Sequence, residues 1–142
     1  MIRILIAVDG SESSDRAVGH LLGKPEWYKD KVELHLLNVQ QALPNVVRRF
    51  SPAAEQLHAF HKEEGEAALA SARAMLDAAG VGYVTHIGIG EPAHVIAHYA
   101  KEKAIDQIVM GTHGHGTVVG LVMGSVTTKV LSLTDLPVLL VK

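Results

Sequence analysis

The chain has 142 residues, of which 48% are hydrophobic and 20% are charged, so it is typical of a single globular domain rather than a disordered chain. Its formal net charge of −2 gives no electrostatic basis for binding nucleic acid or an anionic membrane surface. The absence of cysteine excludes disulfides, zinc–thiolate sites and thiol catalysis.

The first apolar run, from Ile4 to Val8, is too short for the hydrophobic region of a signal peptide and ends in Asp-Gly. No run approaches the roughly 18 apolar residues that a membrane helix needs. We therefore expect a cytoplasmic protein with one domain over residues 1–142.

Apolar runs typical of strands alternate along the chain with runs of helical period. The strands are expected over residues 2–8, 32–39, 81–87, 105–110 and 136–141. The helices are expected to begin near Ser11, Ser51-Pro52, Pro92 and Ser125, where capping side chains or prolines stand. This alternation predicts an α/β fold, with a five-stranded parallel sheet covered by helices on both faces.

The second helix is expected to be long and to end at Ala79. Its period turns six side chains toward the core: Leu57, Phe60, Leu69, Ala72, Leu76 and Ala79. Gly65, in the middle of this helix, is expected to be a weak point or a bend. The preceding stretch, residues 40–49, has no clear period and contains Pro44, so we expect a loop that could close over a site.

Ligands of open parallel sheets bind beyond the carboxyl ends of the strands, where the strand order reverses. Asp9, Val39, Gly88 and Gly111 stand at those ends in this chain. Asp9 can contact a ligand there, or it can simply order an Asp-Gly turn.

A glycine-rich segment follows the fourth expected strand and runs from Gly111 to Ser125. Its glycines allow positive φ and a close backbone approach to a ligand. At the start of the next helix, backbone N–H groups without intrahelical partners and the positive end of the helix dipole suit a phosphate. The hydroxyls of Ser125, Thr127 and Thr128 can add donors. In the alternative interpretation, the glycines only shape a tight connection and Ser125 only caps its helix.

Two histidine pairs lie on expected helices. His94 and His98 have the spacing of a metal-binding pair, but they fall on the polar side of their helix and we identify no acidic third ligand following at helical spacing. We therefore expect a solvated helix face there, and the same for His58 and His61.

The spacing Gly111-x2-Gly114-x9-Gly124-Ser125 resembles the ATP-binding motif of the universal stress protein family. Residues 4–13, Ile-Leu-Ile-Ala-Val-Asp-Gly-Ser-Glu-Ser, look like the opening strand and turn of that family. Gly90-Glu-Pro and the closing Pro-Val-Leu-Leu-Val look like further family landmarks, so the resemblance covers essentially the whole chain. It implies the adenine nucleotide alpha hydrolase-like fold, with strand order 3-2-1-4-5, and ATP as the ligand.

The resemblance also implies which residues hold the nucleotide. The nucleoside would be lined by Ala7 and Asp9, and its adenine edge would meet backbone groups of Val39. The ribose and α-phosphate would be flanked by Gly111, His113 and Gly114. The outer phosphates would be held by Gly124, Ser125, Val126 and Thr127.

His115 departs from the family pattern, because many relatives place Arg or Lys directly after the second glycine. A fixed cation there could help to neutralise phosphate charge. A neutral histidine would weaken that help, and a protonated one would restore it below about pH 6.5. Within the glycine segment, His113 and His115 are expected as donors to phosphate rather than as metal ligands.

Fast ATP hydrolysis needs a positioned water and usually a metal held by protein groups. The chain has no Gly-x4-Gly-Lys-Ser/Thr loop and no acidic residue in the glycine segment. We therefore expect an ATP-binding switch in stress response or signalling, with at most slow hydrolysis. Any Mg2+ would be held mainly through the phosphates and water.

Two alternatives remain open from the sequence. The chain could be a nucleotide-independent interaction protein of the same fold, as are family members that lack the glycine motif. It could instead be an enzyme of the related fold, such as an adenylylating ligase, although the phosphate loop of those enzymes follows the first strand, where this chain has Asp9-Gly-Ser-Glu.

The closing strand bears on the oligomeric state. Val138–Val141 would form an apolar edge strand that is exposed unless something covers it. Relatives pair this strand across a two-fold axis, so the resemblance implies a homodimer.

Overall fold

The structure, a computed structural model, describes residues 1–28, 31–42, 54–114 and 123–142. Its strands are β1 (Ile2–Ala7), β2 (Val32–Gln40), β3 (Tyr83–Ile89), β4 (Gln107–Gly111) and β5 (Val138–Val141). Its helices are α1 (Glu12–Leu22), the short 3-10 helix η1 (Pro25–Tyr28), α3 (Ala54–Ala78), α4 (Pro92–Glu102) and α5 (Ser125–Leu133).

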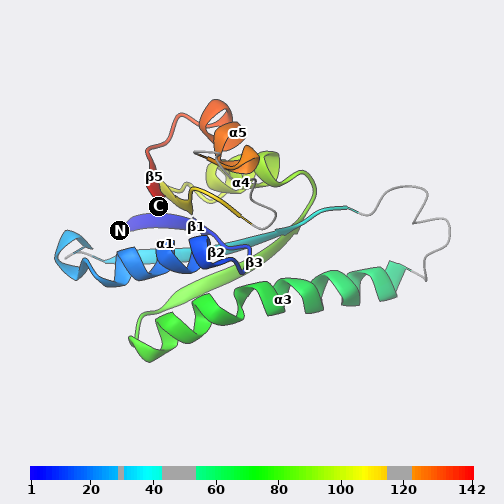
Figure 1. Cartoon of the computed structure of the whole chain (residues 1–142), viewed down its shortest axis with the longest axis horizontal. Helices are drawn as coiled ribbons and strands as arrows, with labels where there is room; N and C mark the ends of the chain where they lie inside the picture. The colour runs from blue at the N-terminus through cyan, green and yellow to red at the C-terminus, as the bar shows by residue number, and fades with distance from the viewer. Residues whose placement is uncertain (29–30, 43–53, 115–122) are drawn as a thin grey trace.

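The five strands form one sheet in the order β3-β2-β1-β4-β5, and every pairing is parallel (Figure 1). This confirms the predicted fold class and strand order. The third strand starts two residues later than expected, at Tyr83. The reason is that Gly80, at a φ of +69°, and the bond from the Val81 N–H to the Leu76 carbonyl still belong to the end of α3. The helix η1 was not expected from the sequence.

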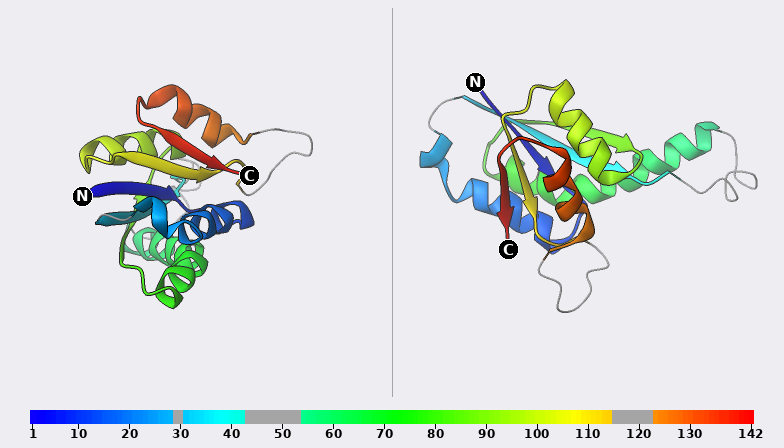
Figure 2. Two further views of the ribbon diagram at one scale, coloured as in Figure 1. Left: turned by 90° about the vertical axis from the view of Figure 1, so that its left-hand side faces the viewer. Right: turned by 90° about the horizontal axis from the view of Figure 1, so that it is seen from above.

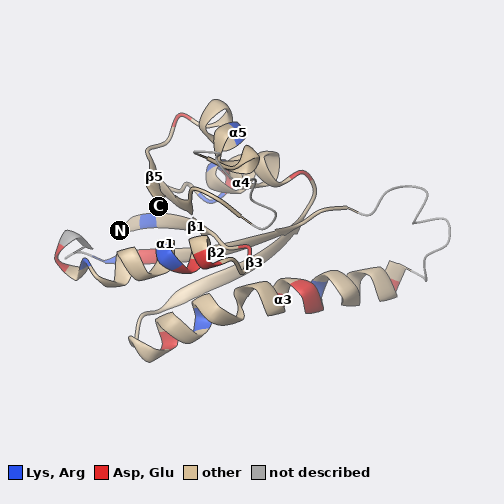
Figure 3. Ribbon diagram, in the orientation of Figure 1, with Lys and Arg blue, Asp and Glu red and all other residues tan. Residues whose placement is uncertain are grey.

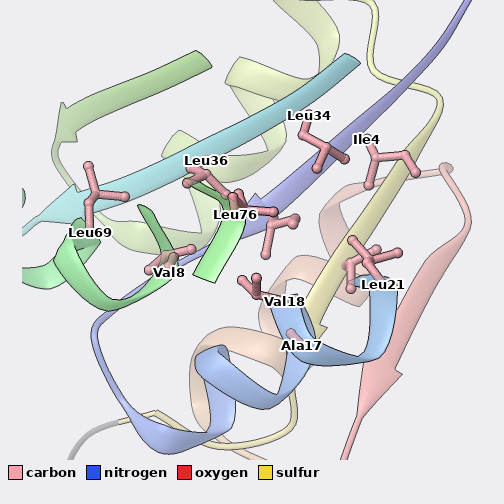
Figure 4. Packing of buried hydrophobic residues seen from close by; sticks show 12 residues of the cluster. Ile4, Val8, Ala17, Val18, Leu21, Leu34, Leu36, Leu69 and Leu76 are labelled. Atoms are coloured by element: carbon pink, nitrogen blue, oxygen red, sulfur yellow. The ribbon is translucent and has the colours of Figure 1, made fainter. Parts of the chain in front are cut away.

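Alternating side chains of the strands build two cores, one on each face of the sheet. Figure 2 shows α1 and α3 on one side of the sheet and α4 and α5 on the other. On one face, Ile4 and Ile6 pack with α1 and α3 in a cluster that Figure 4 shows from close by. On the other face, Leu5 and Leu37 pack against α4 and α5. The same alternation places Ala7 and Val39, near the carboxyl ends of β1 and β2, on the α4 and α5 face.

The long helix α3 differs from its expected burial. Leu69, Ala72 and Leu76 are buried as predicted, but Phe60 is 47% exposed and Ala79 is also exposed. A 25-residue helix spans about 37 Å, whereas the seven residues of β3 span about 23 Å, so α3 cannot be covered along its whole length. Figure 1 shows its N-terminal part extending past the sheet.

The expectation of a solvated face at His58 and His61 is half wrong. His58 is exposed, but His61 is buried, with 7% of its surface exposed. Its Nδ1 has no hydrogen-bond partner among the described residues. The first residues of the predicted second helix, 51–53, and most of the predicted loop, residues 43–49, lie outside the described residues.

Gly65 does not break α3, which runs through it without interruption. A Cβ atom at this position would lie 2.6 Å from Cδ1 of Ile87 and 2.8 Å from both of its Cγ atoms. The missing side chain therefore lets α3 approach β3 closely, and this is its physical role.

No helix of the described residues is long and apolar enough to span a membrane.

We predict that Gly65→Ala lowers the free energy of unfolding by about 1–3 kcal/mol, because its methyl group overlaps the Ile87 side chain. Gly19→Ala is the matched control on α1, where the new methyl meets only Cε of Met75 at 3.5 Å. There the gain in helix propensity should raise stability by about 0.5–1 kcal/mol. Chemical denaturation measures both values, and stabilisation by both substitutions would contradict the close packing of α3 on β3.

Candidate functional site

A cavity of about 440 Å³ lies at the carboxyl ends of β1, β2 and β4, on the face that α4 and α5 cover. The ten residues predicted as site residues all line it: Ala7, Asp9, Val39, Gly111, His113, Gly114, Gly124, Ser125, Val126 and Thr127. The structure thus brings together residues from four separate parts of the chain. Their roles in binding a ligand remain predictions.

Asp9 both orders its turn and faces the glycine segment. Its Oδ1 accepts hydrogen bonds from the Ser11 N–H at 2.9 Å and from the Ser11 hydroxyl. Ser11 in turn caps α1, because its Oγ accepts from the Ser14 N–H. The other carboxylate oxygen, Oδ2, lies where a Cβ on Gly114 would be. The two readings of Asp9, turn former and cavity residue, are therefore compatible.

The first residues of the glycine segment, beginning at Gly111, pack directly against α1. A Cβ on Gly111 would lie 2.6 Å from the carbonyl oxygen of Ser13 and would also overlap its hydroxyl. The Ser13 Oγ accepts a hydrogen bond of 3.3 Å from the His113 N–H. Ser13, which is buried, was not identified from the sequence, because its contact is with main chain about 100 residues away.

The two ends of the glycine segment are joined to each other. The Gly124 N–H donates to the Thr112 carbonyl at 2.6 Å, and the Thr112 N–H donates to the Val141 carbonyl at 3.1 Å. The segment therefore leaves β4 and returns to α5 at one point on the cavity wall. Residues 115–122, which include His115, lie outside the described residues.

The first turn of α5 is open to an anion. Its N-cap is Gly124, and among the described residues no side chain makes a cap hydrogen bond there. The alternative in which Ser125 caps this helix is therefore wrong, because Ser125 is the first helical residue and is exposed. From the sequence, the hydroxyls of Thr127 and Thr128 were expected to donate to a phosphate. In the structure they donate instead to the carbonyls of Gly111 and Gly124.

The N-terminus of α4 also reaches the cavity, through Pro92, but its amides are already occupied. The Glu91 carboxylate accepts from the His94 N–H at 2.9 Å and from the Ala93 N–H at 3.4 Å. The bonds from the His94 backbone and ring lower the pKa of Glu91 to about 2, so the cap stays ionised at neutral pH. The first turn of α1 also reaches the cavity, through Ser14, but the Ser11 side chain caps that helix. Of the helix N-termini at the cavity, α5 is thus the one that offers backbone amides to an anion.

The cavity also has apolar walls that the sequence did not identify as part of a site. Leu37, Ile96 and Met110 line it, and each is buried in the core that the sheet forms with α4 and α5. Gln41 adds a polar group beside Val39. Strand alternation could have identified Leu37, since it lies two positions before Val39 on the same face of β2. A cavity with apolar walls and the first turn of a helix in its lining suits a ligand with a flat ring and an anionic tail.

Asn38, on β2, holds the chain at the end of β1, and it was not identified from the sequence. Its buried side chain donates to the Val8 carbonyl at 2.9 Å and accepts from the Gln40 side chain at 2.7 Å. These bonds hold the end of β1 against β2 immediately before Asp9. A polar residue inside an apolar strand is the sequence signal that could have revealed it.

The helix histidines are engaged by neighbouring carboxylates. The His94 ring bonds to Glu91, and Nε2 of His98 lies 3.4 Å from the Glu102 carboxylate. The expectation that no acidic residue follows at helical spacing is therefore wrong, because Glu102 stands four positions after His98. Among the described residues, no group of three or more His, Asp or Glu side chains could hold a metal ion.

Comparisons with known proteins extend over the whole chain. It is 32% identical to a universal stress protein of Methanocaldococcus jannaschii, MJ0531, covering 99% of this chain and 81% of that protein. It is 31% identical to the universal stress protein YxiE of Bacillus subtilis, covering 99% and 98%. The solved structure of MJ0577, another M. jannaschii protein, superimposes with a TM-score of 0.82 at 28% identity, covering 99% and 94%.

Some solved structures of similar proteins contain adenine nucleotides. A universal stress protein in complex with cAMP superimposes with a TM-score of 0.71 at 25% identity, covering 99% of this chain and 97% of the other. A universal stress protein family protein of Arabidopsis thaliana with AMP bound superimposes with a TM-score of 0.70 at 22% identity, covering 100% and 92%.

The sequence model of the universal stress protein family matches residues 1–142, the full length given. Together with the two relatives above 30% identity, this match settles the family from sequence, and the strand order agrees with it. The chain belongs to the universal stress protein family.

Proposed function

We propose that this protein is an ATP-binding switch in stress response or signalling. The observation that carries the proposal is one cavity that is lined both by apolar side chains and by the first turn of α5, where no described side chain caps the helix. Adenine nucleotides bound to other proteins of this fold support the choice of ligand. A nucleotide switch needs a compartment that contains ATP, and we place it in the cytoplasm.

Each part of the nucleotide has a proposed site. Adenine stacks between the apolar walls, and backbone groups of Val39 meet its edge, while Ala7 and Asp9 line the nucleoside. Gly111, His113 and Gly114 flank the ribose and the α-phosphate. The outer phosphates meet backbone amides of Gly124, Ser125, Val126 and Thr127.

The same site is poorly equipped for hydrolysis. Asp9 is the one carboxylate among the described lining residues, and its Oδ1 already accepts two hydrogen bonds from Ser11. Mg2+ would therefore be held mainly by the phosphates and water, and any hydrolysis would be slow. Occupancy of the site, rather than turnover, is the proposed signal.

The second candidate is a nucleotide-independent interaction protein of the same fold. The cavity argues against it, because all ten predicted site residues line it and no described side chain caps the first turn of α5 there. An adenylylating ligase is disfavoured for a different reason. The turn after β1 is tightened by the Asp9–Ser11 bonds and leads directly into α1 without a phosphate loop.

Gly114→Val tests the proposed binding site. The new side chain overlaps the Asp9 carboxylate, so it should raise the dissociation constant for ATP about tenfold or more in a calorimetric titration. The matched control is Gly82→Val, where a Cβ meets no atom within 4 Å and the position does not line the cavity. Unchanged ATP affinity in Gly114→Val would contradict the proposed site. A wild-type protein that binds no nucleotide would favour the interaction protein.

We also propose a homodimer that pairs two copies of β5. This strand lies at one edge of the sheet, and its four apolar residues are only partly buried. The carbonyls of Pro137 and Val141 accept hydrogen bonds from β4 and the residue after it. Because backbone groups alternate along a strand, the N–H and C=O groups of Val138 and Leu140 face the open edge. Pairing across a two-fold axis would remove this edge.

Light scattering after size exclusion should give about 30 kDa, which is twice the chain mass of 15.2 kDa. Leu140→Pro removes an N–H that points away from β4, and it should shift the mass toward that of a single chain. Leu140→Val, which keeps the N–H, serves as the control. A single-chain mass for the wild type at micromolar concentration would contradict the proposed dimer.

A further inference from the structure

An ion pair joins the two helices that border the cavity. Nζ of Lys129, on α5, lies 3.7 Å from Oε1 of Glu91, the residue that caps α4. Glu91 directly precedes Pro92, and Lys129 stands four positions after Ser125, so each partner is next to a cavity residue. Figure 3 shows α5 and the start of α4 on the same side of the sheet.

The ammonium group of Lys129 lies within reach of the first turn of α5. One helical turn rises about 5.4 Å, and long side chains on a helix point back toward its N-terminus. Ser125 and Lys129 are four positions apart and so occupy the same face of α5. A change of rotamer would therefore carry the ammonium toward the place where the outermost phosphate is proposed to lie.

The rest of the phosphate end has no fixed cation in the sequence. Residues 104–128, which include the entire glycine segment, contain neither Lys nor Arg. None of the described residues that line the cavity is Lys or Arg either. Each phosphate beyond the first adds negative charge, so a longer phosphate chain gains most from a nearby ammonium.

The pair with Glu91 is weak enough to exchange. Both side chains are nearly half exposed, at 48% and 44%, and such exposed pairs contribute little to stability. Glu91 would keep its bonds from the Ala93 and His94 amides if Lys129 moved away, so the carboxylate would not lose all its partners. A charge-assisted bond from the ammonium to phosphate is stronger than this exposed pair.

We propose that Lys129 is a specificity-determining residue that contacts the terminal phosphate of a nucleoside triphosphate, and that Glu91 holds it when no such phosphate is present. The inference rests on the proposed nucleotide site and adds phosphate-number selectivity to it. A nucleoside monophosphate ends short of the ammonium and gains nothing from it.

Calorimetric titration of AMP, ADP and ATP into the wild type and Lys129→Gln tests the proposal. Lys129→Gln should weaken ATP binding about tenfold, because it removes one charge-assisted bond, and should change AMP binding less than about twofold. Lys129→Arg should retain ATP affinity. Lys101→Gln, which removes the same charge from an exposed position near the end of α4, is the matched control and should change neither affinity.

Glu91→Gln provides an independent test with the opposite sign. It removes the carboxylate that competes for Lys129 but keeps an oxygen that can accept the α4 amides, so ATP binding should tighten about twofold with AMP unchanged. Equal changes in AMP and ATP affinity for Lys129→Gln, or no change in either, would overturn the proposal while leaving the nucleotide site intact. Absence of binding of all three nucleotides to the wild type would instead overturn the nucleotide site itself.

Discussion

The contact between α1 and the main chain of Gly111 fixes the geometry on which the rest of the site depends. Because the Ser13 carbonyl lies 2.6 Å from where a Cβ would be, only glycine can end β4 here without displacing α1. The bond from the Gly124 N–H to the Thr112 carbonyl then returns the chain beside its point of departure. The packing of Gly111 on Ser13 and this main-chain bond thereby place the start of α5 at the cavity.

The helices α4 and α5 both border the cavity, and their N-termini differ in charge. Glu91 caps the N-terminus of α4 with a carboxylate that hydrogen bonds keep ionised, whereas no described side chain caps α5 at Gly124. This asymmetry favours anions at α5, while Leu37, Ile96 and Met110 give the same cavity apolar walls. It fits the proposed nucleotide site, in which Asp9 is the one carboxylate among the described lining residues, too few for rapid hydrolysis.

The alternation of strand and helix patterns predicted the α/β class with a five-stranded parallel sheet. The strand order and the ten residues that line one cavity were predicted only through the resemblance to the universal stress protein family. The sequence predictions failed where the outcome depended on contacts between distant parts of the chain. The helical period places Phe60 on the inward face of α3, but its side chain is exposed because α3 is longer than β3. A glycine in the middle of a helix predicted a weak point or a bend at Gly65, but its missing side chain makes room for Ile87. The ion pair of Glu91 with Lys129 could not be predicted from the sequence, because it depends on the packing of α4 beside α5.

The central claim is that an adenine nucleotide occupies this cavity in the native protein. Native mass spectrometry of gently purified protein tests it most directly, because the chain mass of 15.2 kDa makes one bound nucleotide easy to resolve. The account predicts a mass increase of one adenine nucleotide per chain in the wild type and its loss in Gly114→Val. A wild-type protein that carries no nucleotide, and takes up none after incubation with ATP, would contradict it.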